Sequence, residues 1–257
     1  MKPPATTLVI ARYEEDLEWI TEVPDHFRVV VYNKGTLIPS LSALERVQSI
    51  TPRDNAGREA ETYLHHLLEH PSDPGEWTVF CQGDPFTHSP DFLGLLKAQD
   101  QWRDIQPLTC QFYESLKIPP PYLLERDTAG NLGGLRIRPE TFSLHLWTAC
   151  RFADSGSLAH RARYSNIHDL PSGANMAAHF LRLAGLPEMA DRAEVADCGL
   201  FAYGAIFAVR SRLASTLNIE SLKTLHRLAK QDDFNAYLLE RLWLHLFGEP
   251  FLSLRPQ

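Results

Sequence analysis

The chain of 257 residues is poor in cysteine and has no long hydrophobic run. Its four cysteines, Cys81, Cys110, Cys150 and Cys198, stand far apart, which excludes a C-x-x-C redox motif and a zinc-knuckle spacing. The apolar run near the N-terminus ends at Arg12 and is too short for a signal-peptide core, and no segment reaches the roughly 18 apolar residues that a membrane helix needs. We therefore expect a cytoplasmic protein with buried, reduced thiols and no membrane span.

Positive charge is also scarce, because 32 acidic residues face 25 basic ones and give a formal charge of -7 with a pI near 5.9. Such a chain has no global positive field to hold a phosphate backbone, so nucleic acid is not an expected partner. With 14 Gly, 18 Pro and 44% hydrophobic residues, the composition excludes a disordered or collagen-like chain. The sequence leaves the oligomeric state open.

Segments typical of strands and helices alternate along the first hundred residues. The hydrophobic patterns predict strands at 7–11, 27–32, 47–50 and 77–81, and helices at 14–22, 59–70 and 90–99. Strands separated by helices pair in parallel through right-handed crossovers. The chain is therefore predicted to be an α/β protein with a single open sheet, mixed but mainly parallel, flanked by helices.

The second half of the chain is less regular and ends in a helical part. We expect helices at 144–152, 174–183, 210–217, 220–229 and 234–247, and a strand at 203–209. No charge run or flexible linker marks a boundary, so residues 1–257 are predicted to form a single domain.

The predicted strands end in polar residues. Arg12, Tyr13, Glu14 and Asp16 follow the first strand, Asn33 and Lys34 the second, and Gln82, Gly83 and Asp84 the fourth. Ligands of open α/β sheets bind beyond the carboxyl ends of the strands. An arginine in that position can fork onto a phosphate or a carboxylate, although a solvated helix start with acids near the dipole would explain the same residues.

The segment Asn55-Ala-Gly57-Arg58-Glu59 opens a predicted helix. Free backbone amides with an arginine can form an anion site, and Gly57 would let a ligand approach the backbone. Neither G-x-x-x-x-G-K nor G-x-G-x-x-G is present. A capping role for Asn55 would explain this segment equally well.

Two carboxylates are candidates for chemistry. Asp84 could bind a divalent ion or a substrate hydroxyl, with His88 as a second contact, or it could simply form an Asx turn with its own backbone. Glu240 lies among apolar residues, where an acid acquires a raised pKa suited to a general base unless an arginine pairs with it. Gly204, at the start of a predicted strand, indicates close approach of a ligand or of backbone.

Taken together, the strings 11–16 (ARYEED), 31–35 (VYNKG), 55–59 (NAGRE), 63–66 (YLHH) and 80–86 (FCQGDPF) resemble a family of uncharacterised fungal and bacterial domains that is similar to GT-A glycosyltransferases. The resemblance covers residues 6–90 and resumes more weakly at 203–209 and 240–243. GT-A enzymes end the metal-binding strand in Asp-x-Asp, whereas this chain has Gln82-Gly83-Asp84. Dependence on Mn or Mg is therefore open, and Arg58 and Lys34 could neutralise a diphosphate instead.

The resemblance implies a Rossmann-like nucleotide-binding half at 1–104 and an acceptor half at 105–257. A nucleotide-sugar donor would contact Arg12, Tyr13, Glu14, Asp16, Asn33, Lys34, Asn55, Gly57, Arg58, Gln82 and Gly83. A hydroxyl acceptor would contact Phe86, His88, Tyr203, Gly204, Ala205 and Trp243. Asp84 would meet the diphosphate, the sugar or a metal ion, and Glu240 would be the base of an inverting transfer. Two other classes stay open: a non-catalytic α/β binding module for nucleotides or sugars, and a metal-dependent hydrolase that uses Asp84 and His88.

Overall fold

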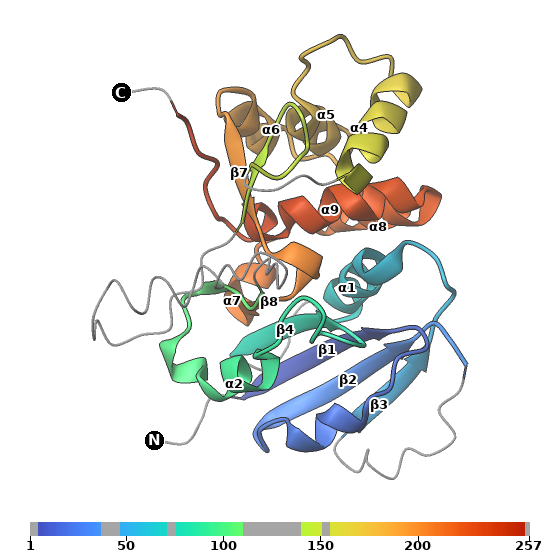
Figure 1. The fold of residues 1–257 in the computed structure, drawn as a ribbon, viewed down its shortest axis with the longest axis vertical. Helices are drawn as coiled ribbons and strands as arrows, with labels where there is room; N and C mark the ends of the chain where they lie inside the picture. The colour runs from blue at the N-terminus through green and yellow to red at the C-terminus, as the bar shows by residue number, and fades with distance from the viewer. Residues whose placement is uncertain (1–4, 37–46, 71–75, 110–139, 151–154, 255–257) are drawn as a thin grey trace.

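A six-stranded, mixed and mostly parallel sheet flanked by helices forms the lower part of the molecule in the view of Figure 1. The structure is a computed structural model and describes residues 5–36, 47–70, 76–109, 140–150 and 155–254. The strand order is β3-β2-β1-β4-β8-β5. This architecture confirms the predicted α/β class with a C-terminal helical part. The prediction of a single sheet is wrong, because β6 (Glu140–Ser143) and β7 (Cys198–Phe201) form a separate antiparallel two-stranded sheet.

The parallel strands lie at one side of the sheet. β1 (Thr6–Arg12) runs between β2 (Phe27–Asn33) and β4 (Trp77–Gln82) and is parallel to both, and β3 (Val47–Pro52) extends the sheet beyond β2. β8 (Phe207–Arg210) and β5 (Ile105–Pro107) complete it as antiparallel strands. The register pairs Arg12 with Asn33 and Ala11 with Gln82, so the polar strand ends lie level with one another.

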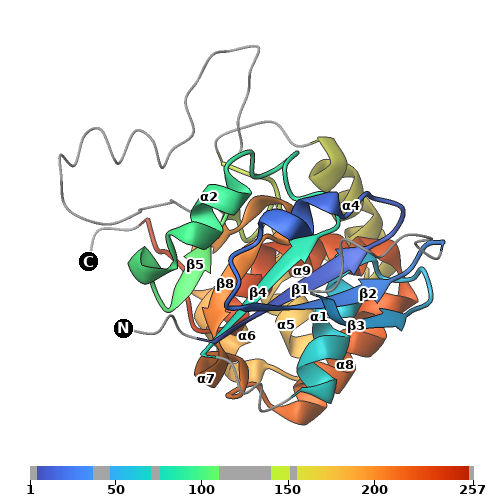
Figure 2. The ribbon, with the colours of Figure 1, turned by 90° about the horizontal axis from the view of Figure 1, so that it is seen from below.

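Successive residues of β1 face opposite sides of the sheet, and each side has its own core. Leu8 and Ile10 pack towards the short helices η1 (Glu18–Glu22) and α2 (Phe92–Lys97), whereas Val9 packs towards α1 (Arg58–Glu69). The long C-terminal helices α8 (Ile219–Gln231) and α9 (Asp233–Leu246) lie with α1 on the second side (Figure 2). Burial on both faces explains why the parallel strands read as continuous apolar runs.

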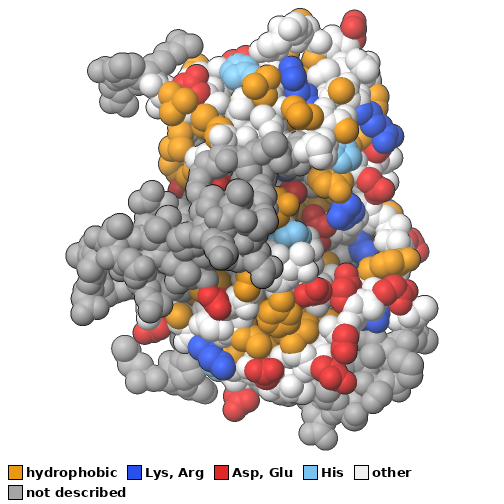
Figure 3. All heavy atoms as spheres, in the orientation of Figure 1, with side chains coloured by type: hydrophobic (Ala, Val, Ile, Leu, Met, Phe, Trp, Pro, Cys, Tyr) orange, Lys and Arg blue, Asp and Glu red, His pale blue; other side chains and the backbone are white. Residues whose placement is uncertain are grey.

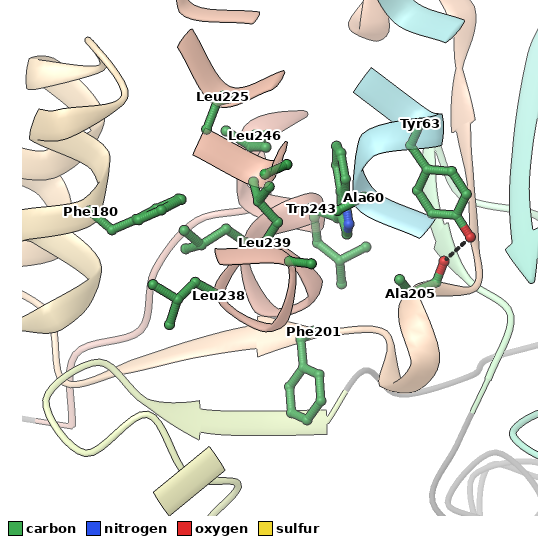
Figure 4. Packing of buried hydrophobic residues seen from close by; sticks show 14 of the residues in the cluster. Ala60, Tyr63, Phe180, Phe201, Ala205, Leu225, Leu238, Leu239, Trp243 and Leu246 are labelled. Carbon is green, nitrogen blue, oxygen red and sulfur yellow. Dashed lines mark hydrogen bonds between the residues drawn. The ribbon is translucent and has the colours of Figure 1, made fainter. Parts of the chain in front are cut away.

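Helix α9 also joins the sheet to the remainder of the chain. Its side chains Leu238, Leu239 and Trp243 are buried between Tyr63 of α1 and Phe180 (Figure 4). Around them lie the following elements: β6 (Glu140–Ser143), α4 (Ser155–Ile167), α5 (Met176–Leu183), α6 (Pro187–Glu194), β7 (Cys198–Phe201), η5 (Tyr203–Ala205) and α7 (Ser211–Ala214), with η3 (Gln99–Gln101) beside α2. No helix in the described ranges has both the length and the apolar character needed to cross a bilayer.

Four further expectations from the sequence are wrong. Residues 14–22 form a loop and the short 3-10 helix η1, whose N-cap residue is Leu17; before it, Asp16 accepts a hydrogen bond from the amide of Glu18, two residues along, which is a local turn contact and not a helix cap. Residues 144–150 form no helix; the chain turns back after β6, and Ala149 pairs with Phe142 (residues 151 and 152 lie outside the described ranges). The segment 203–209 begins as the turn η5 rather than as a strand. Cys150 is exposed, whereas Cys81 and Cys198 are buried free thiols; Cys110 is not among the described residues.

The start of α1 differs from the predicted cap. Gly57 is the N-cap residue, with φ 63°, and no side chain caps this helix. A Cβ on Gly57 would lie 2.7 Å from the carbonyl oxygen of Ala229 in α8 and 2.9 Å from Cβ of Glu61. Close packing of α1 on α8 therefore accounts for the glycine without a ligand.

Replacing Gly57 with alanine is expected to lower the free energy of unfolding by at least about 2 kcal/mol, because the methyl group meets backbone at a positive φ. Urea unfolding of Gly57→Ala measures this. Gly94→Ala is the matched control, since nothing lies within 4 Å of the added Cβ and alanine favours helix α2 by up to roughly 1 kcal/mol. Equal stability of the two variants would contradict the packing role of Gly57.

Candidate functional site

A pocket of about 280 Å³ opens at the carboxyl ends of the parallel strands. The chain leaves β1 towards β2 and β3 on one side and returns to β4 on the other, so the strand order reverses next to β1. Such reversal points form the crevices in which open α/β sheets bind ligands. The lining residues come from the ends of β1, β2 and β4 and from the start of α1: Ala11, Arg12, Tyr13, Glu15, Lys34, Asn55, Arg58, Glu59 and Gln82.

The side chain of Arg12 joins the loops that follow β1 and β2. Its Nη1 donates to Oδ1 of Asn33 at 2.6 Å and to the carbonyl oxygens of Tyr13 and Thr36, and its Nε donates to the carbonyl oxygen of Glu15 at 2.8 Å. Both Arg12 and Asn33 are buried. Arg12 therefore shapes the wall of the pocket, and most of its donors are used inside the protein.

Lys34 ties the end of β2 to the loop that precedes α1. Its Nζ donates to the carbonyl oxygens of Ala56 and Arg58 and lies 3.0 Å from Oε2 of Glu61. Burial lowers the pKa of Lys34, and the Glu61 carboxylate opposes that shift. All three ammonium protons have partners, so a diphosphate would have to displace one of them to reach Lys34.

Arg58 is the most exposed cation of the pocket. It has a positive φ of 50°, which is unusual for a residue with a side chain. Its guanidinium lies 4.6 Å from the ring centroid of Tyr237 in α9, and Nη1 donates to the Tyr237 hydroxyl at 2.8 Å. About half of the side chain is exposed, so its other donors can meet an anionic ligand.

Glu59 is a largely buried acid of the pocket. From the sequence alone it is considered only as part of the segment that opens a helix. Its side chain is 10% exposed, and its nearest cation, Nε of Arg58, is 3.7 Å away. Burial raises the pKa of Glu59 to about 7, with Glu240 adding to the rise and Arg58 opposing it. Its place in the first turn of α1, after a glycine and an arginine, is the only signal that could have found it.

Glu240 and Gln82 hold the turn η5 from two sides. Oε1 of Glu240 accepts a hydrogen bond from the amide of Gly204 at 2.8 Å, and Nε2 of Gln82 donates to the Gly204 carbonyl at 2.9 Å. The His88 ring packs on Gly204, where an added Cβ would lie 2.6 Å from Cδ2, and Tyr203 contacts the same ring edge to face. The missing side chain of Gly204 therefore makes room for the ring of His88. Ala205 follows with φ 55° and accepts from the Tyr63 hydroxyl (Figure 4).

Asp84 does not line the pocket. Its Oδ1 accepts from the amide of Phe86 at 3.0 Å and its Oδ2 accepts from the Thr87 hydroxyl, which is the Asx turn weighed as an alternative. The side chain is exposed, and its charge acts on His88, whose pKa is lowered by burial and raised in part by Glu240 and Asp84. No group of three His, Cys, Asp or Glu residues suited to a metal ion occurs in the part of the chain that the structure describes.

Several other predicted contacts lie outside the pocket. Glu14 accepts hydrogen bonds from Thr36, which lower its pKa, and Gly83 leaves room for the Glu15 carboxylate. Phe86 packs edge to face on Trp19, and Trp243 is fully buried against aromatic rings of the core. The pocket thus gathers six of the predicted donor-binding residues, namely Arg12, Tyr13, Lys34, Asn55, Arg58 and Gln82, and adds Glu15 and Glu59.

Acidic and basic side chains are interspersed over the middle of the face drawn in Figure 3, between the sheet and the upper helices.

Comparison of the chain with protein-family models, with curated proteins and with solved structures gives no match.

Replacing Glu59 with glutamine is expected to raise the free energy of unfolding at pH 8 by roughly 1–3 kcal/mol. A pKa of about 7 in the folded chain, against an ordinary 4.5, means that ionised Glu59 destabilises the fold above pH 7. This cost falls between pH 7 and 4.5 as the folded carboxyl binds its proton, so the gain vanishes near pH 4. Urea unfolding at both pH values measures it.

Glu69→Gln is the control for this prediction, because Glu69 is exposed at the other end of the same helix. Its stability should stay within about 0.5 kcal/mol of the parent at both pH values. A Glu59→Gln variant that gains as much at pH 4 as at pH 8 would contradict the raised pKa.

Proposed function

We propose that this chain is a GT-A-like glycosyltransferase that binds a nucleotide-sugar donor in the pocket at the carboxyl edge and transfers the sugar to a hydroxyl acceptor. The observation that carries the proposal is the position of the pocket next to β1, where the strand order reverses, with walls built from the ends of three parallel strands and the start of α1. Part of the strings that resemble GT-A glycosyltransferases, including Arg12, Lys34 and Arg58, lines this pocket, which supports the proposal.

The chemistry of the lining suits the parts of such a donor. Arg58 offers exposed guanidinium donors for a diphosphate, and Asn55 and Gln82 offer amide groups for sugar hydroxyls. Tyr13 is 50% exposed and offers an aromatic ring on which a nucleobase can stack. Charge that develops on the leaving diphosphate would be stabilised mainly by Arg58, because Arg12 and Lys34 have partners inside the protein.

The proposed reaction is a single displacement. The acceptor hydroxyl attacks the anomeric carbon while the bond from that carbon to the diphosphate oxygen breaks, and its electron pair leaves with the nucleoside diphosphate. One displacement inverts the configuration of the anomeric carbon. The hydroxyl proton has to pass to a base that borders the pocket.

A non-catalytic binding module is the second candidate, and one observation favours it. All three cations in the lining make internal hydrogen bonds, and two of them, Arg12 and Lys34, are also buried, which leaves the half-exposed Arg58 as the main compensation for the leaving group. A site with this arrangement can bind a nucleotide without promoting its departure. The hydrolase alternative is less favoured because both carboxylate oxygens of Asp84 already accept hydrogen bonds.

Isothermal titration with UDP, GDP, CDP and ADP, each with and without Mn²⁺, tests the donor site. At least one of them is expected to bind with a micromolar dissociation constant, and Arg58→Ala should weaken that binding about 10-fold or more through loss of a charge-assisted hydrogen bond. Arg182→Ala is the control, because Arg182 forms ion pairs with Asp191 and Glu194 away from the pocket.

The other classes predict different results. Nucleotide binding without transfer of sugar from any of UDP-glucose, UDP-N-acetylglucosamine and GDP-mannose would favour the binding module. Binding of Mn²⁺ alone, with phosphoester hydrolysis that is lost in Asp84→Asn, would favour the hydrolase. No binding of any nucleoside diphosphate to the parent chain would contradict the transferase.

A further inference from the structure

We propose that Glu59 is the base that takes the acceptor proton, and that Glu240 is a positioning residue that holds the turn η5 in place. This inference rests on the proposed function, since it assigns a role within the same pocket. It differs from the expectation drawn from the sequence, which gave the role of base to Glu240.

The first argument is which carboxylate borders the pocket. Glu59 is among the lining residues and Glu240 is not. Glu59 stands in the first turn of α1 beside Arg58, the residue best able to hold the diphosphate. Because the hydroxyl attacks opposite the leaving diphosphate, the sugar in the proposed step lies between the diphosphate on Arg58 and the carboxylate of Glu59. The two functions of the pocket, anion binding and proton acceptance, are thus carried by adjacent residues of one backbone turn.

The second argument is what each carboxylate already binds. Oε1 of Glu240 accepts from the Gly204 amide at 2.8 Å, and Oε2 lies 3.5 Å from Nη1 of the buried Arg241. Within the described residues, no side chain donates a hydrogen bond to Glu59, and its closest cation, at 3.7 Å, is beyond hydrogen-bond distance. Among the described residues, the Glu59 carboxylate has a hydrogen bond from its own backbone amide alone, whereas Oε1 of Glu240 is engaged by the Gly204 amide and its Oε2 faces Arg241.

The third argument is the charge that surrounds Glu59. Burial and the negative charge of Glu240 favour its protonated form, and Arg58 and Lys34 favour the ionised form. Glu15 adds a further acid to the pocket lining. A carboxyl poised between these influences changes its protonation state near neutral pH, which is the range in which a general base is most effective.

In the assigned step, the hydroxyl oxygen of the acceptor bonds to the anomeric carbon and its proton moves to a carboxylate oxygen of Glu59. The bond between the anomeric carbon and the diphosphate breaks, and the electron pair stays on the diphosphate. When water is the acceptor, the same step hydrolyses the donor. Release of nucleoside diphosphate therefore reports the reaction without knowledge of the natural acceptor.

The experiment measures nucleoside diphosphate release from UDP-glucose, UDP-N-acetylglucosamine and GDP-mannose between pH 5 and pH 9. Glu59→Gln is compared with the parent chain and with the control Glu69→Gln. The glutamine keeps the shape of the side chain, so binding of the nucleoside diphosphate should change less than about 3-fold. Its maximal rate is expected to fall about 100-fold or more, as general bases contribute that much.

The pH profile separates a base from a merely structural residue. The parent rate measured below saturation, which reports the protein without bound donor, should rise with pH through about 7 as Glu59 loses its proton, and the residual rate of Glu59→Gln should lack that rise. Glu240→Gln tests the positioning role: it should lower the rate while keeping the pH-dependent rise, because the base is still present.

Two outcomes would overturn the inference in distinguishable ways. If Glu59→Gln releases nucleotide at the parent rate with the same pH profile, or if Glu240→Gln abolishes the rise, Glu59 is not the base and the transferase still stands. If the parent chain neither binds nor cleaves any of these donors, the proposed function fails and the role of Glu59 fails with it.

Discussion

The pocket depends on one buried carboxylate, that of Glu61 in helix α1. Glu61 is 1% exposed and meets two cations, Lys34 at the end of β2 and Arg53 in the segment after β3, and a hydrogen-bonding ring nitrogen of His226 in α8. Burial opposes its ionisation, but hydrogen bonds from His226 and Arg53 together with the charge of Lys34 hold the pKa of Glu61 well below its ordinary range. Removal of one partner from a buried pair of this kind typically costs about 3–5 kcal/mol.

The polar cluster around Glu61 also holds the backbone of the loop that precedes α1 in place. Through Lys34 it holds the carbonyls of Ala56 and Arg58, and hence the loop that presents Arg58 and Glu59 to the pocket. Because the folded pKa of Glu61 is depressed, its stabilising effect is present above the ordinary value of 4.5 and is lost as the pH falls below it. The loop and the pocket should therefore be most firmly held at neutral pH, where the pocket would have to work.

Two strained turns stand on either side of the site, and the C-terminal helices hold both. Gly57 and Arg58 have φ values of 63° and 50°, and Gly204 and Ala205 have 72° and 55°. A left-handed residue with a side chain costs on the order of 1–3 kcal/mol and persists only where surrounding contacts impose it. Tyr237 holds the first turn and Glu240 the second, both from α9. The last helix of the chain thus shapes a pocket whose walls come from the first hundred residues.

The sequence predicted the elements with strong periodicity and the place of the pocket. Strands such as β2 and β4 are continuous apolar runs closed by polar residues, and the carboxyl-edge rule brings those ends together without further information. Asn55 failed as a cap because tight packing on α8 places Gly57 at that position, and this contact joins residues 172 positions apart (229 minus 57). A contact between residues so far apart in the sequence cannot be predicted from local sequence patterns.

The roles of the polar residues were harder to predict than their location. Arg12 and Lys34 look like ligand contacts in the sequence, yet their hydrogen bonds are mostly internal, because a buried cation needs acceptors whether or not a ligand is present. Glu59 looked like an ordinary helix-start acid, and only its burial beside Glu240 distinguishes it. The acceptors of Arg12 and Lys34 lie on neighbouring segments of the first 61 residues, whereas the acid that influences Glu59 lies in the distant helix α9; neither can be read from the local sequence.

In the proposed transferase, the adjacency of Arg58 and Glu59 would couple donor binding to proton acceptance. With no ligand, the guanidinium of Arg58 is the main charge that favours ionised Glu59. A bound diphosphate would neutralise that guanidinium and add negative charge beside the carboxylate, and both effects raise its affinity for a proton. The carboxylate is then a stronger base in the presence of the donor than in its absence. A pair of charges on one helical turn can in this way make the proton transfer most favourable only when there is a sugar to transfer.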